Sequence, residues 1–285
     1  MATVSDAPAR DGAAPGLGYA SPVSERRFAR LSDSGIDPDV ARVAEEVPAA
    51  FVYSGKSHVV MMCSPADLED LAVGFTLTEE IVQSASDIGL IQVEPHSRGV
   101  ELRVEIPQAA IDRLALRTRA LAGRTGCGLC GVEAIDDAVR IPHQVSSPLR
   151  LGADALWRAG ISLEDHQPLN RDTRAVHAAA WATSEGTLRV IREDVGRHNA
   201  LDKVLGALAL AGIDPGSGFL VVTSRASFEL VQKAAVAGVP LLAAVSRPTG
   251  LAIRLADSAG ITLVGLLRGR SANVYSHPER LRAGA

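Results

Sequence analysis

The chain has 285 residues, of which 47% are hydrophobic and 22% charged, and its formal net charge is -4. A chain of this length and composition can bury a substantial core, as one large domain or two smaller ones. The slightly acidic balance provides no overall basic field, which argues against binding to nucleic acid or to an acidic membrane surface. Any anion-binding site must therefore be local.

The N-terminal segment, residues 1–24, is expected to be a disordered tail. It is rich in Ala, Gly, Pro and Ser and lacks the apolar core of a signal peptide. No apolar stretch in the chain approaches the roughly 20 residues of a membrane-spanning helix, so we expect no membrane segment. Three cysteines cannot form a structural disulfide framework for a chain of this size, which favours a reducing compartment and a cytoplasmic location.

Residues 25–120 predict an N-terminal α+β domain. Apolar and β-branched residues at 49–53 and 58–63 flank a Ser-Gly-Lys turn, which indicates a hairpin. A helix should follow, because Ser64-Pro65 and Asp67 form a start signal and apolar residues then recur at helical spacing. Two further strands are predicted at 90–93, stopped by Pro95, and at 99–106.

The segment 121–142 is predicted to be a flexible loop, and it contains Cys127 and Cys130. Four glycines surround this C-x-x-C pair and no helical or strand period survives. Three chemistries use such spacing: half of a zinc site, a dithiol redox couple, or a nucleophile that carries sulfur with a second thiol as its helper. We take Cys127 as the nucleophile, although spacing alone does not rank the two cysteines.

The zinc site and the redox couple each require features beyond the two cysteines. A zinc site of four cysteines is excluded within one chain by count, but a mixed site with His143, His177 or His198 stays open. Thioredoxin-like chemistry normally places the pair at the start of a helix rather than in a glycine-rich loop. The third cysteine, Cys63, is interpreted as a small buried residue on a strand.

Residues 143–285 predict an α/β domain with a mixed sheet. Apolar runs at 188–192, 219–223, 241–245 and 261–267 are interpreted as strands, and helical patterns follow Asn199, a predicted N-cap, and cover 228–237 and 251–259. Alternation of strands and helices is typical of a sheet covered by helices.

Arginine follows several of these strands. Arg197, Arg225 (after Ser224) and Arg247 stand at three successive strand-to-helix junctions, and the last strand runs into a segment from Arg268 to Ser271. Ligands of open α/β sheets gather at the carboxyl ends of strands, and arginine binds phosphate through paired donors. We therefore expect a ligand that bears pyrophosphate. The alternative is that the arginines are solvated or paired with Glu193, Asp194, Asp202 and Glu229.

Nucleotide enzymes of the common kinds are not indicated, since the chain has no Walker A sequence and no G-x-G-x-x-G after a strand. His198 can serve in proton transfer or ligand contact, or simply bond its own turn. His177 is interpreted as structural, and Trp157 and Trp181 as packing residues.

Several long motifs, in order, resemble the FdhD family of formate dehydrogenase accessory sulfurtransferases. They are the segment 57–65, the C-G-x-C-G loop at 127–131, Asp-Val-Gly-Arg-His-Asn-Ala-Leu-Asp-Lys at 194–203, Thr-Ser-Arg at 223–225, and the ending at 265–281. The resemblance covers about residues 25–283, and it is far more specific than the C-x-x-C pair alone.

The resemblance implies a cytidine-deaminase-like fold in the second half, a homodimer, and a role in maturing a molybdenum or tungsten formate dehydrogenase. Family members take sulfur from a cysteine desulfurase of the IscS type as a persulfide on the loop. They pass this sulfur to Mo-bis(molybdopterin guanine dinucleotide), which then enters the dehydrogenase. The cofactor is thus a bound client, and no permanent metal is predicted.

Carried over by motif position, Cys127 is the persulfide cysteine and Cys130 its assisting partner. The cofactor-binding stretch is Leu266, Leu267, Arg268, Gly269, Arg270 and Ser271, joined by the strand-end residues Ser224, Arg225, Arg247, Arg197 and His198. Two rival functions are a cofactor-binding chaperone without sulfur chemistry and a zinc-dependent deaminase or hydrolase. The combination of H-x-E followed by P-C-x-x-C that zinc deaminases carry is missing from the sequence.

Overall fold

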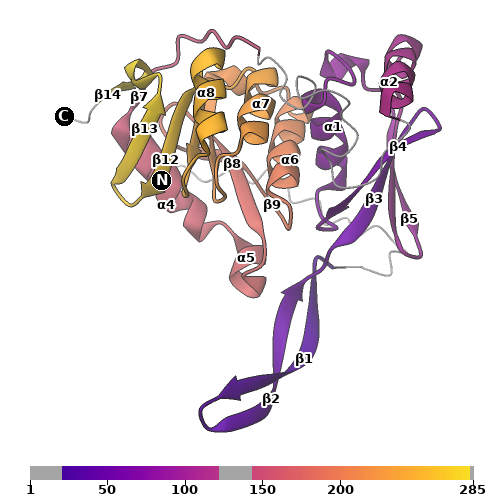
Figure 1. Ribbon diagram of the computed structural model, residues 1–285, viewed down its shortest axis with the longest axis vertical. Coiled ribbons are helices and arrows are strands. Elements are labelled where there is room, and N and C mark those ends of the chain that lie inside the picture. The colour runs from indigo at the N-terminus through magenta and orange to yellow at the C-terminus, as the bar shows by residue number, and fades with distance from the viewer. Residues whose placement is uncertain (1–20, 122–142, 283–285) are drawn as a thin grey trace.

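The computed structural model describes residues 21–121 and 143–282. The predicted tail up to residue 20 and the loop that holds Cys127 and Cys130 lie outside the described residues. Two α/β units stand side by side, and a long hairpin extends away from both (Figure 1). Within the described ranges no helix is long and apolar enough to cross a membrane.

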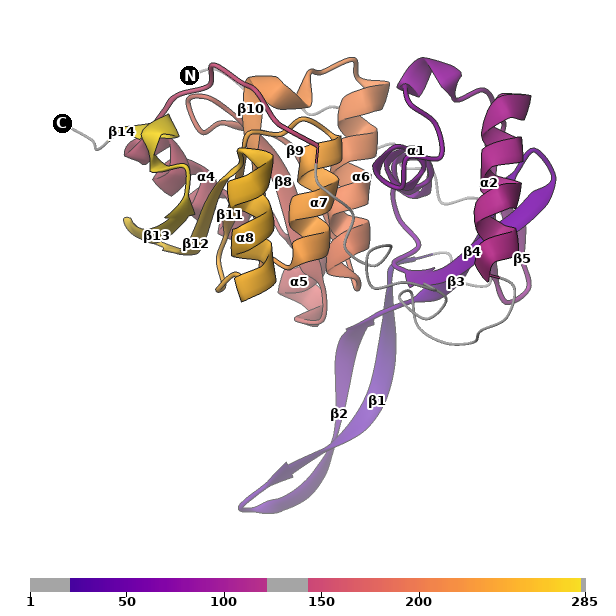
Figure 2. The ribbon, with the colours of Figure 1, turned by 45° about the horizontal axis from the view of Figure 1, so that its top comes forward.

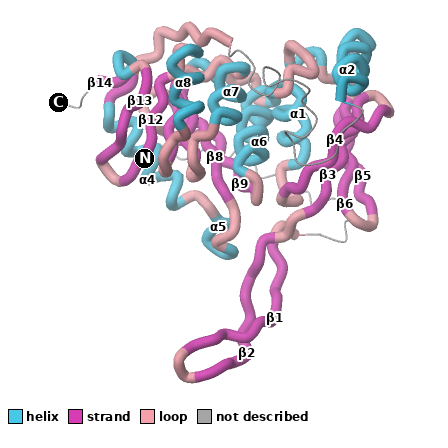
Figure 3. Tube along the Cα trace, viewed as in Figure 1, coloured by secondary structure: helices cyan, strands magenta, loops and turns pink. Residues whose placement is uncertain are grey.

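The projecting hairpin, here called the hairpin arm, consists of β1 (Val23–Ser32) and β2 (Gly35–Ala44) in antiparallel register. Figure 3 shows it as a two-stranded ribbon that stands clear of the rest of the chain. Leu31 and Ile36 pair across it and are 78% and 69% exposed. An ion pair of 2.7 Å between Arg42 and Asp172 ties its base to the second unit. The sequence analysis did not predict these strands.

The first unit is a four-stranded sheet covered by helices. Its elements are β3 (Val47–Tyr53), β4 (Lys56–Cys63), α1 (Leu68–Thr78), β5 (Ile91–His96), β6 (Gly99–Val104) and α2 (Gln108–Leu121), with strand order β4-β3-β6-β5. The predicted hairpin and first helix are confirmed. The prediction that a strand stops at Pro95 is wrong, because β5 is an edge strand, where a residue without an N–H is tolerated.

The second unit is built on a six-stranded mixed sheet with the order β13-β12-β11-β10-β8-β9. Its strands are β8 (His177–Thr183), β9 (Leu188–Asp194), β10 (Gly218–Val222), β11 (Leu241–Ala244), β12 (Thr262–Arg268) and β13 (Ser271–Ser276), and its helices are α4 (Ala153–Asp165), α5 (Pro168–Thr173), α6 (Arg197–Leu210), α7 (Phe228–Val236) and α8 (Gly250–Ala259). The short strands β7 (Leu151–Gly152) and β14 (Leu281–Arg282) pair with each other. The predicted mixed α/β class is confirmed.

Two hydrophobic clusters show how the helices cover this sheet. Side chains of α6, α7 and α8 pack with one face of the central strands, through residues such as Leu220, Leu242 and Leu263. The alternate residues Phe219, Val221 and Leu241 pack against α4 on the other face. This alternation is the period of two that a strand buried on both faces requires. Figure 2 shows α6, α7 and α8 together on one side of the strands.

Helices α1 and α6 join the two units at close range. A Cβ atom on Gly206 would lie 1.9 Å from the backbone oxygen of Asp70, and one on Gly74 would lie 1.8 Å from the backbone oxygen of Asp202. No side chain fits at either position, so the two backbones can approach each other only through glycine. The crossing of α1 and α6 therefore fixes how the units sit against each other.

Replacing Gly206 with alanine is expected to destabilise the protein by about 2–3 kcal/mol, because the added methyl group must push the two backbones apart. The matched control is Gly250→Ala at the start of α8, where the nearest atom to an added Cβ is a flexible arginine nitrogen at 3.7 Å. That variant should stay within about 1 kcal/mol of the parent chain. Urea denaturation followed by circular dichroism measures both changes, and equal midpoints for the two variants would contradict the role of the crossing.

Cys63 ends β4 inside the first core and is fully buried. This confirms the interpretation of Cys63 as a buried strand residue. Burial raises the pKa of its thiol to about 12. The charge of Lys203 lowers this pKa and the charge of Asp194 raises it, but burial is the largest cause. A thiol with such a pKa is not a nucleophile at neutral pH.

Alkylation of the folded protein at pH 8 should therefore modify Cys63 roughly a thousandfold more slowly than alkylation of the urea-unfolded chain, because only the thiolate reacts. Peptide mass spectrometry after a timed iodoacetamide pulse gives the rate at this one cysteine. Rapid labelling of Cys63 in the folded protein would show that the strand end is open to solvent.

Candidate functional site

The candidate site is one edge of the six-stranded sheet, at the carboxyl ends of β9, β10, β11 and β12. Strands β10, β11 and β12 are parallel to one another, and β9 has the same direction because it is antiparallel to β8, which is antiparallel to β10. All four strand-end segments therefore meet at one edge, here called the carboxyl edge. Strand β8 starts at this edge with His177, between the ends of β9 and β10.

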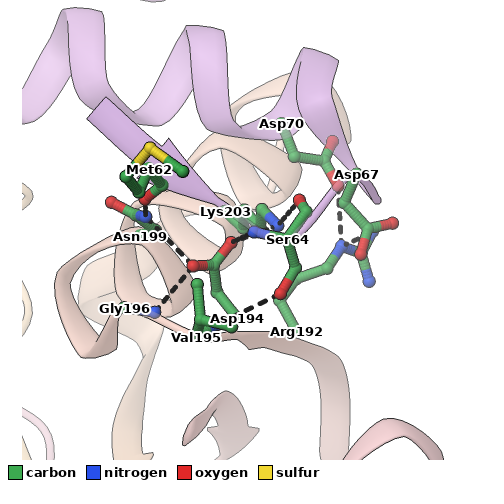
Figure 4. Close-up of polar contacts among 10 residues, drawn as sticks. All are labelled: Met62, Ser64, Asp67, Asp70, Arg192, Asp194, Val195, Gly196, Asn199 and Lys203. Carbon is green, nitrogen blue, oxygen red and sulfur yellow. Dashed lines mark hydrogen bonds and ion pairs between the residues drawn. The ribbon is translucent and has the colours of Figure 1, made fainter. Parts of the chain in front are cut away.

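Asp194, at the end of β9, is completely buried and its two carboxylate oxygens are fully used (Figure 4). One oxygen accepts from the backbone N–H of Ser64 at 3.0 Å and from Lys203 Nζ at 2.6 Å. The other accepts from the N–H of Gly196 at 2.8 Å and from Asn199 Nδ2 at 3.0 Å. This carboxylate is a structural junction of the two units, not a partner for a ligand.

Asn199 has a different role from the predicted one. The helix α6 begins after Gly196, which is its N-cap residue and provides no side chain for capping. Asn199 lies inside the first turn and donates instead to Asp194 and to the backbone oxygen of Met62 at 2.8 Å. The N-cap prediction is wrong because the helix already begins at Arg197, so Asn199 lies in its first turn, where its side chain bonds to Asp194 and to the first unit.

The other acidic residues considered as arginine partners are also engaged elsewhere. Glu193 accepts from the backbone N–H groups of Leu169 and Asn170, at 2.9 and 2.7 Å, at the start of α5. Asp202 accepts from Thr78 at 2.7 Å and pairs with the buried Lys233 at 3.0 Å. Of the four acidic residues, only Glu229 approaches one of the three junction arginines.

Arg225 and Arg247 follow β10 and β11, and both side chains are exposed. Neither they nor Arg268 forms an ion pair within the part of the chain that the structure describes. Ser224 beside them is buried, and its hydroxyl donates to the backbone oxygen of Arg225 at 3.1 Å. Among the described residues, therefore, no carboxylate neutralises these three guanidinium groups at the carboxyl edge.

In the stretch from Leu266 to Ser271, the first three residues end β12, Gly269 and Arg270 form the turn, and Ser271 begins β13. Leu267 is buried in the core beside α4, so its side chain is a packing residue. Leu266 and Gly269 both have φ near +54°, and the strand register shifts between Gly265 and Arg268. Arg270 pairs with Asp154 of α4 at 2.7 Å, with both groups exposed. Of this predicted stretch, Arg268, Gly269 and Ser271 are exposed at the edge.

The remaining predicted residues, Arg197 and His198, start α6 and lie beside Glu229 of α7. His198 Nε2 is 2.8 Å from Glu229 Oε2, and Arg197 Nη2 is 3.6 Å from the same oxygen. The neighbouring imidazole is the main cause that lowers the pKa of Glu229 to about 2. Burial, with the positive charges of Arg197 and His198, lowers the pKa of His177. His177, interpreted as structural from the sequence, starts β8 opposite Asp194 of β9, and its pKa is affected by both site residues.

Of the ligands considered for a mixed zinc site, the structure describes the histidines but not Cys127 and Cys130. Cys127 and Cys130 lie outside the described residues, so their predicted roles stay predictions. His143 contacts Glu80 at 2.8 Å and His198 contacts Glu229. Within residues 21–121 and 143–282, no three His, Cys, Asp or Glu side chains are placed to hold a metal ion together.

The edge has the properties that an anionic substrate requires. Helices α6 and α7 both begin there, and neither has a side-chain cap on its first N–H groups, although α7 starts with Ser227. Unpaired N–H groups at a helix start favour anions, and the neighbouring arginines add bidentate donors. A phosphate-bearing substrate therefore fits the donor set of the carboxyl edge.

Comparison with known proteins gives a consistent result. The model of the FdhD/NarQ family matches residues 44–282. The chain is 53% identical to "Sulfur carrier protein FdhD" of Xanthomonas axonopodis pv. citri (strain 306) over 242 residues, which are 85% of this chain and 86% of that protein. A protein of the same name from Bordetella petrii is 52% identical over 241 residues, 85% of this chain and 87% of the relative.

A solved structure agrees with the sequence relatives. It comes from Desulfotalea psychrophila and carries the provisional description of a formate dehydrogenase accessory protein. It superimposes with a TM-score of 0.73 at 25% identity, over 91% of this chain and 99% of the other. Together with the match to the family model over most of the chain, these relatives establish that the chain belongs to the FdhD/NarQ family.

Proposed function

We propose that this chain is a sulfur carrier that accepts persulfide sulfur on Cys127 from a cysteine desulfurase. It transfers the sulfur to Mo-bis(molybdopterin guanine dinucleotide) before that molecule enters formate dehydrogenase. We place this activity in the cytoplasm and in a homodimer, as the family resemblance implies. The relatives named sulfur carrier protein FdhD, at 52–53% identity, support the sulfur-carrying part of the proposal.

The observation that carries the proposal is the set of arginines at the carboxyl edge. Arg225, Arg247 and Arg268 end or follow three adjacent parallel strands, and none is neutralised by a carboxylate within the described ranges. Adjacent strands are about 4.8 Å apart, so the three groups span about 10 Å of the edge. A dinucleotide with a pyrophosphate link matches an array of this length and charge better than a single small anion does.

The first chemical step uses the C-x-x-C pair. The thiolate of Cys127 attacks the outer sulfur of the desulfurase persulfide, the donor's sulfur–sulfur bond breaks, and the donor leaves as its own thiolate. Cys127 then holds the sulfur as a persulfide, with Cys130 as its assisting thiol.

The second step depends on positioning. Arg225, Arg247 and Arg268, with Ser224 beside them, would hold the phosphates of the substrate and so keep its metal end within reach of the persulfide. Holding two reactants in place converts an encounter in solution into a reaction within one complex, which is the main contribution expected of the protein.

Replacing Cys127 with alanine should abolish persulfide formation and activation of the dehydrogenase, because the thiol that receives the sulfur is removed and Cys63, the cysteine in the described ranges, is buried. Mass spectrometry after incubation with a desulfurase and cysteine should show an increment of about 32 Da, one sulfur, on the Cys127 peptide of the parent chain. The matched control is Cys63→Ala, which should keep the increment. Full activation by a Cys127→Ala, Cys130→Ala double variant would instead support a chaperone that only binds the cofactor.

Replacing Arg225 with glutamine should weaken binding of guanosine diphosphate, a soluble part of the substrate, by about tenfold, since a charged hydrogen bond contributes roughly 1.5 kcal/mol. Arg247→Gln should act similarly. Arg189→Gln is the matched control, because Arg189 is an exposed arginine near the start of β9, at the opposite end of the sheet. Isothermal titration calorimetry measures all three, and equal losses for Arg189 and Arg225 would remove the carboxyl edge as the binding site.

A further inference from the structure

We propose that His177, Arg197 and His198 form a phosphate subsite of the carboxyl edge, and that the carboxylate of Glu229 occupies this subsite until a phosphate group displaces it. The four residues are here called the His198 cluster. The inference rests on the proposed function, because it assigns a place to part of the same phosphate-bearing substrate.

The cluster is assembled from three elements that meet at the edge. His177 starts β8, Arg197 and His198 start α6, and Glu229 lies in the first turn of α7. Arg197, His198 and Glu229 have side chains 30–32% exposed, so an anion can approach them from solvent. Strand β8 lies directly beside β10, which leads to Ser224 and Arg225. The cluster therefore continues the row of edge arginines by one or two strand spacings, about 5–10 Å.

Two buried nitrogens of the cluster lack an aligned acceptor. Arg197 Nε has no hydrogen-bond partner within the described ranges. His198 Nε2 is close to Glu229 Oε2, at 2.8 Å, but the contact is an ion pair without hydrogen-bond alignment. Arg197 reaches the same carboxylate at only 3.6 Å. One carboxylate thus meets the two cations imperfectly, whereas a phosphate group presents more oxygens in more directions.

Glu229 is held where a substrate anion is expected. Acidic groups are stabilised at a helix start, and Glu229 lies in the first turn of α7. The hydroxyl of Ser227 donates to Glu229 Oε2 at 3.1 Å and does not cap the helix. The contact with the His198 imidazole is the largest cause that lowers the pKa of Glu229, to about 2, and Ser227 and Arg197 lower it further, so the carboxyl is ionised. The carboxylate neutralises the subsite in the free protein and competes with any incoming anion.

His177 reports whether the subsite is filled. Burial is the largest cause that lowers its pKa, Arg197 and His198 on α6 lower it further, and Asp194, its cross-strand neighbour on β9, opposes them. A bound phosphate adds negative charge beside His177, so its pKa should rise and binding should take up protons. Affinity should accordingly increase as the pH falls through the range in which the histidine titrates.

The experiment uses inorganic pyrophosphate as the probe, titrated by calorimetry into the full-length protein. Glu229→Gln should bind pyrophosphate about fivefold more tightly, because a competing partly exposed charge is removed, and Arg197→Gln should bind it at least fivefold more weakly. The matched control is Glu279→Gln, since Glu279 also contacts a histidine, His277, at 3.0 Å, but it follows β13, whose Ser276 pairs with Leu263 near the start of β12, at the opposite end of the sheet from the carboxyl edge. The control should bind as the parent chain does.

A second measurement needs no variant. In the parent chain, nuclear magnetic resonance titration of the histidines should show the pKa of His177 rising when pyrophosphate is added. The proposal is overturned if that pKa does not move, or if Glu229→Gln binds pyrophosphate no more tightly than the control. Either result leaves persulfide formation on Cys127 untouched, so the subsite and the sulfur-carrier function fail separately. Conversely, if Cys127 forms no persulfide but pyrophosphate binding is intact, the sulfur-carrier function fails and the subsite stands.

Discussion

The buried carboxylate of Asp194 is the interaction on which the arrangement of this protein depends. It accepts hydrogen bonds from the turn before α1 and from the turn before α6, and it forms the buried ion pair with Lys203. Removing one partner of such a pair typically costs about 3–5 kcal/mol, because a charge is left uncompensated in the interior. The same contacts set where α6 begins, and hence where Arg197 and His198 stand at the edge.

The placement of negative charge explains how an acidic protein can present a cationic edge. Asp194 and Asp202 are buried with lysine partners, and Glu193 caps α5. Each of these three carboxylates is close in sequence to the carboxyl edge, but its oxygens bond to other groups than the edge arginines. Within the described ranges, Arg225, Arg247 and Arg268 therefore have no carboxylate partner, although the chain as a whole has a net charge of -4. Glu229 is the exception, and its contacts with Arg197 and His198 are long or misaligned.

Local patterns in the sequence predicted much of the fold. The alternation around Ser54-Gly55 and the apolar runs of β10, β11 and β12 indicated strands correctly, because such buried strands carry β-branched and large apolar residues. Strand β8 was not predicted, since its run of alanines has weak strand propensity and is buried by its neighbours. The hairpin arm was missed because its exposed strands mix arginine, aspartate and proline without a clear apolar face.

The sequence predicted which arginines lie at the candidate site, but not which residues contact one another there. Strand-end positions follow from the order of strands and helices, so Arg225 and Arg247 could be identified from the sequence. Interactions between residues 130 or more apart, such as Ser64 with Asp194, leave no local signal, and Asn199 was consequently misread as a cap. Glu229 was considered only as a charge partner, because nothing in its neighbourhood along the chain shows that it faces His198 from another helix.

The crossing of α1 and α6 fixes the position of the first unit, which precedes the cysteine-bearing segment in the chain, relative to the carboxyl edge. The described chain ends at α2 of the first unit and resumes near His143, which pairs with Glu80 just after α1. Gly74 and Gly206 hold α1 against α6, and α6 carries Arg197 and His198 at its start. The position of the first unit, which includes α2, relative to the carboxyl edge is thus fixed by backbone contact between α1 and α6. A carrier that must bring sulfur repeatedly to one substrate site requires such a fixed frame, because small displacements between reacting groups reduce transfer rates steeply.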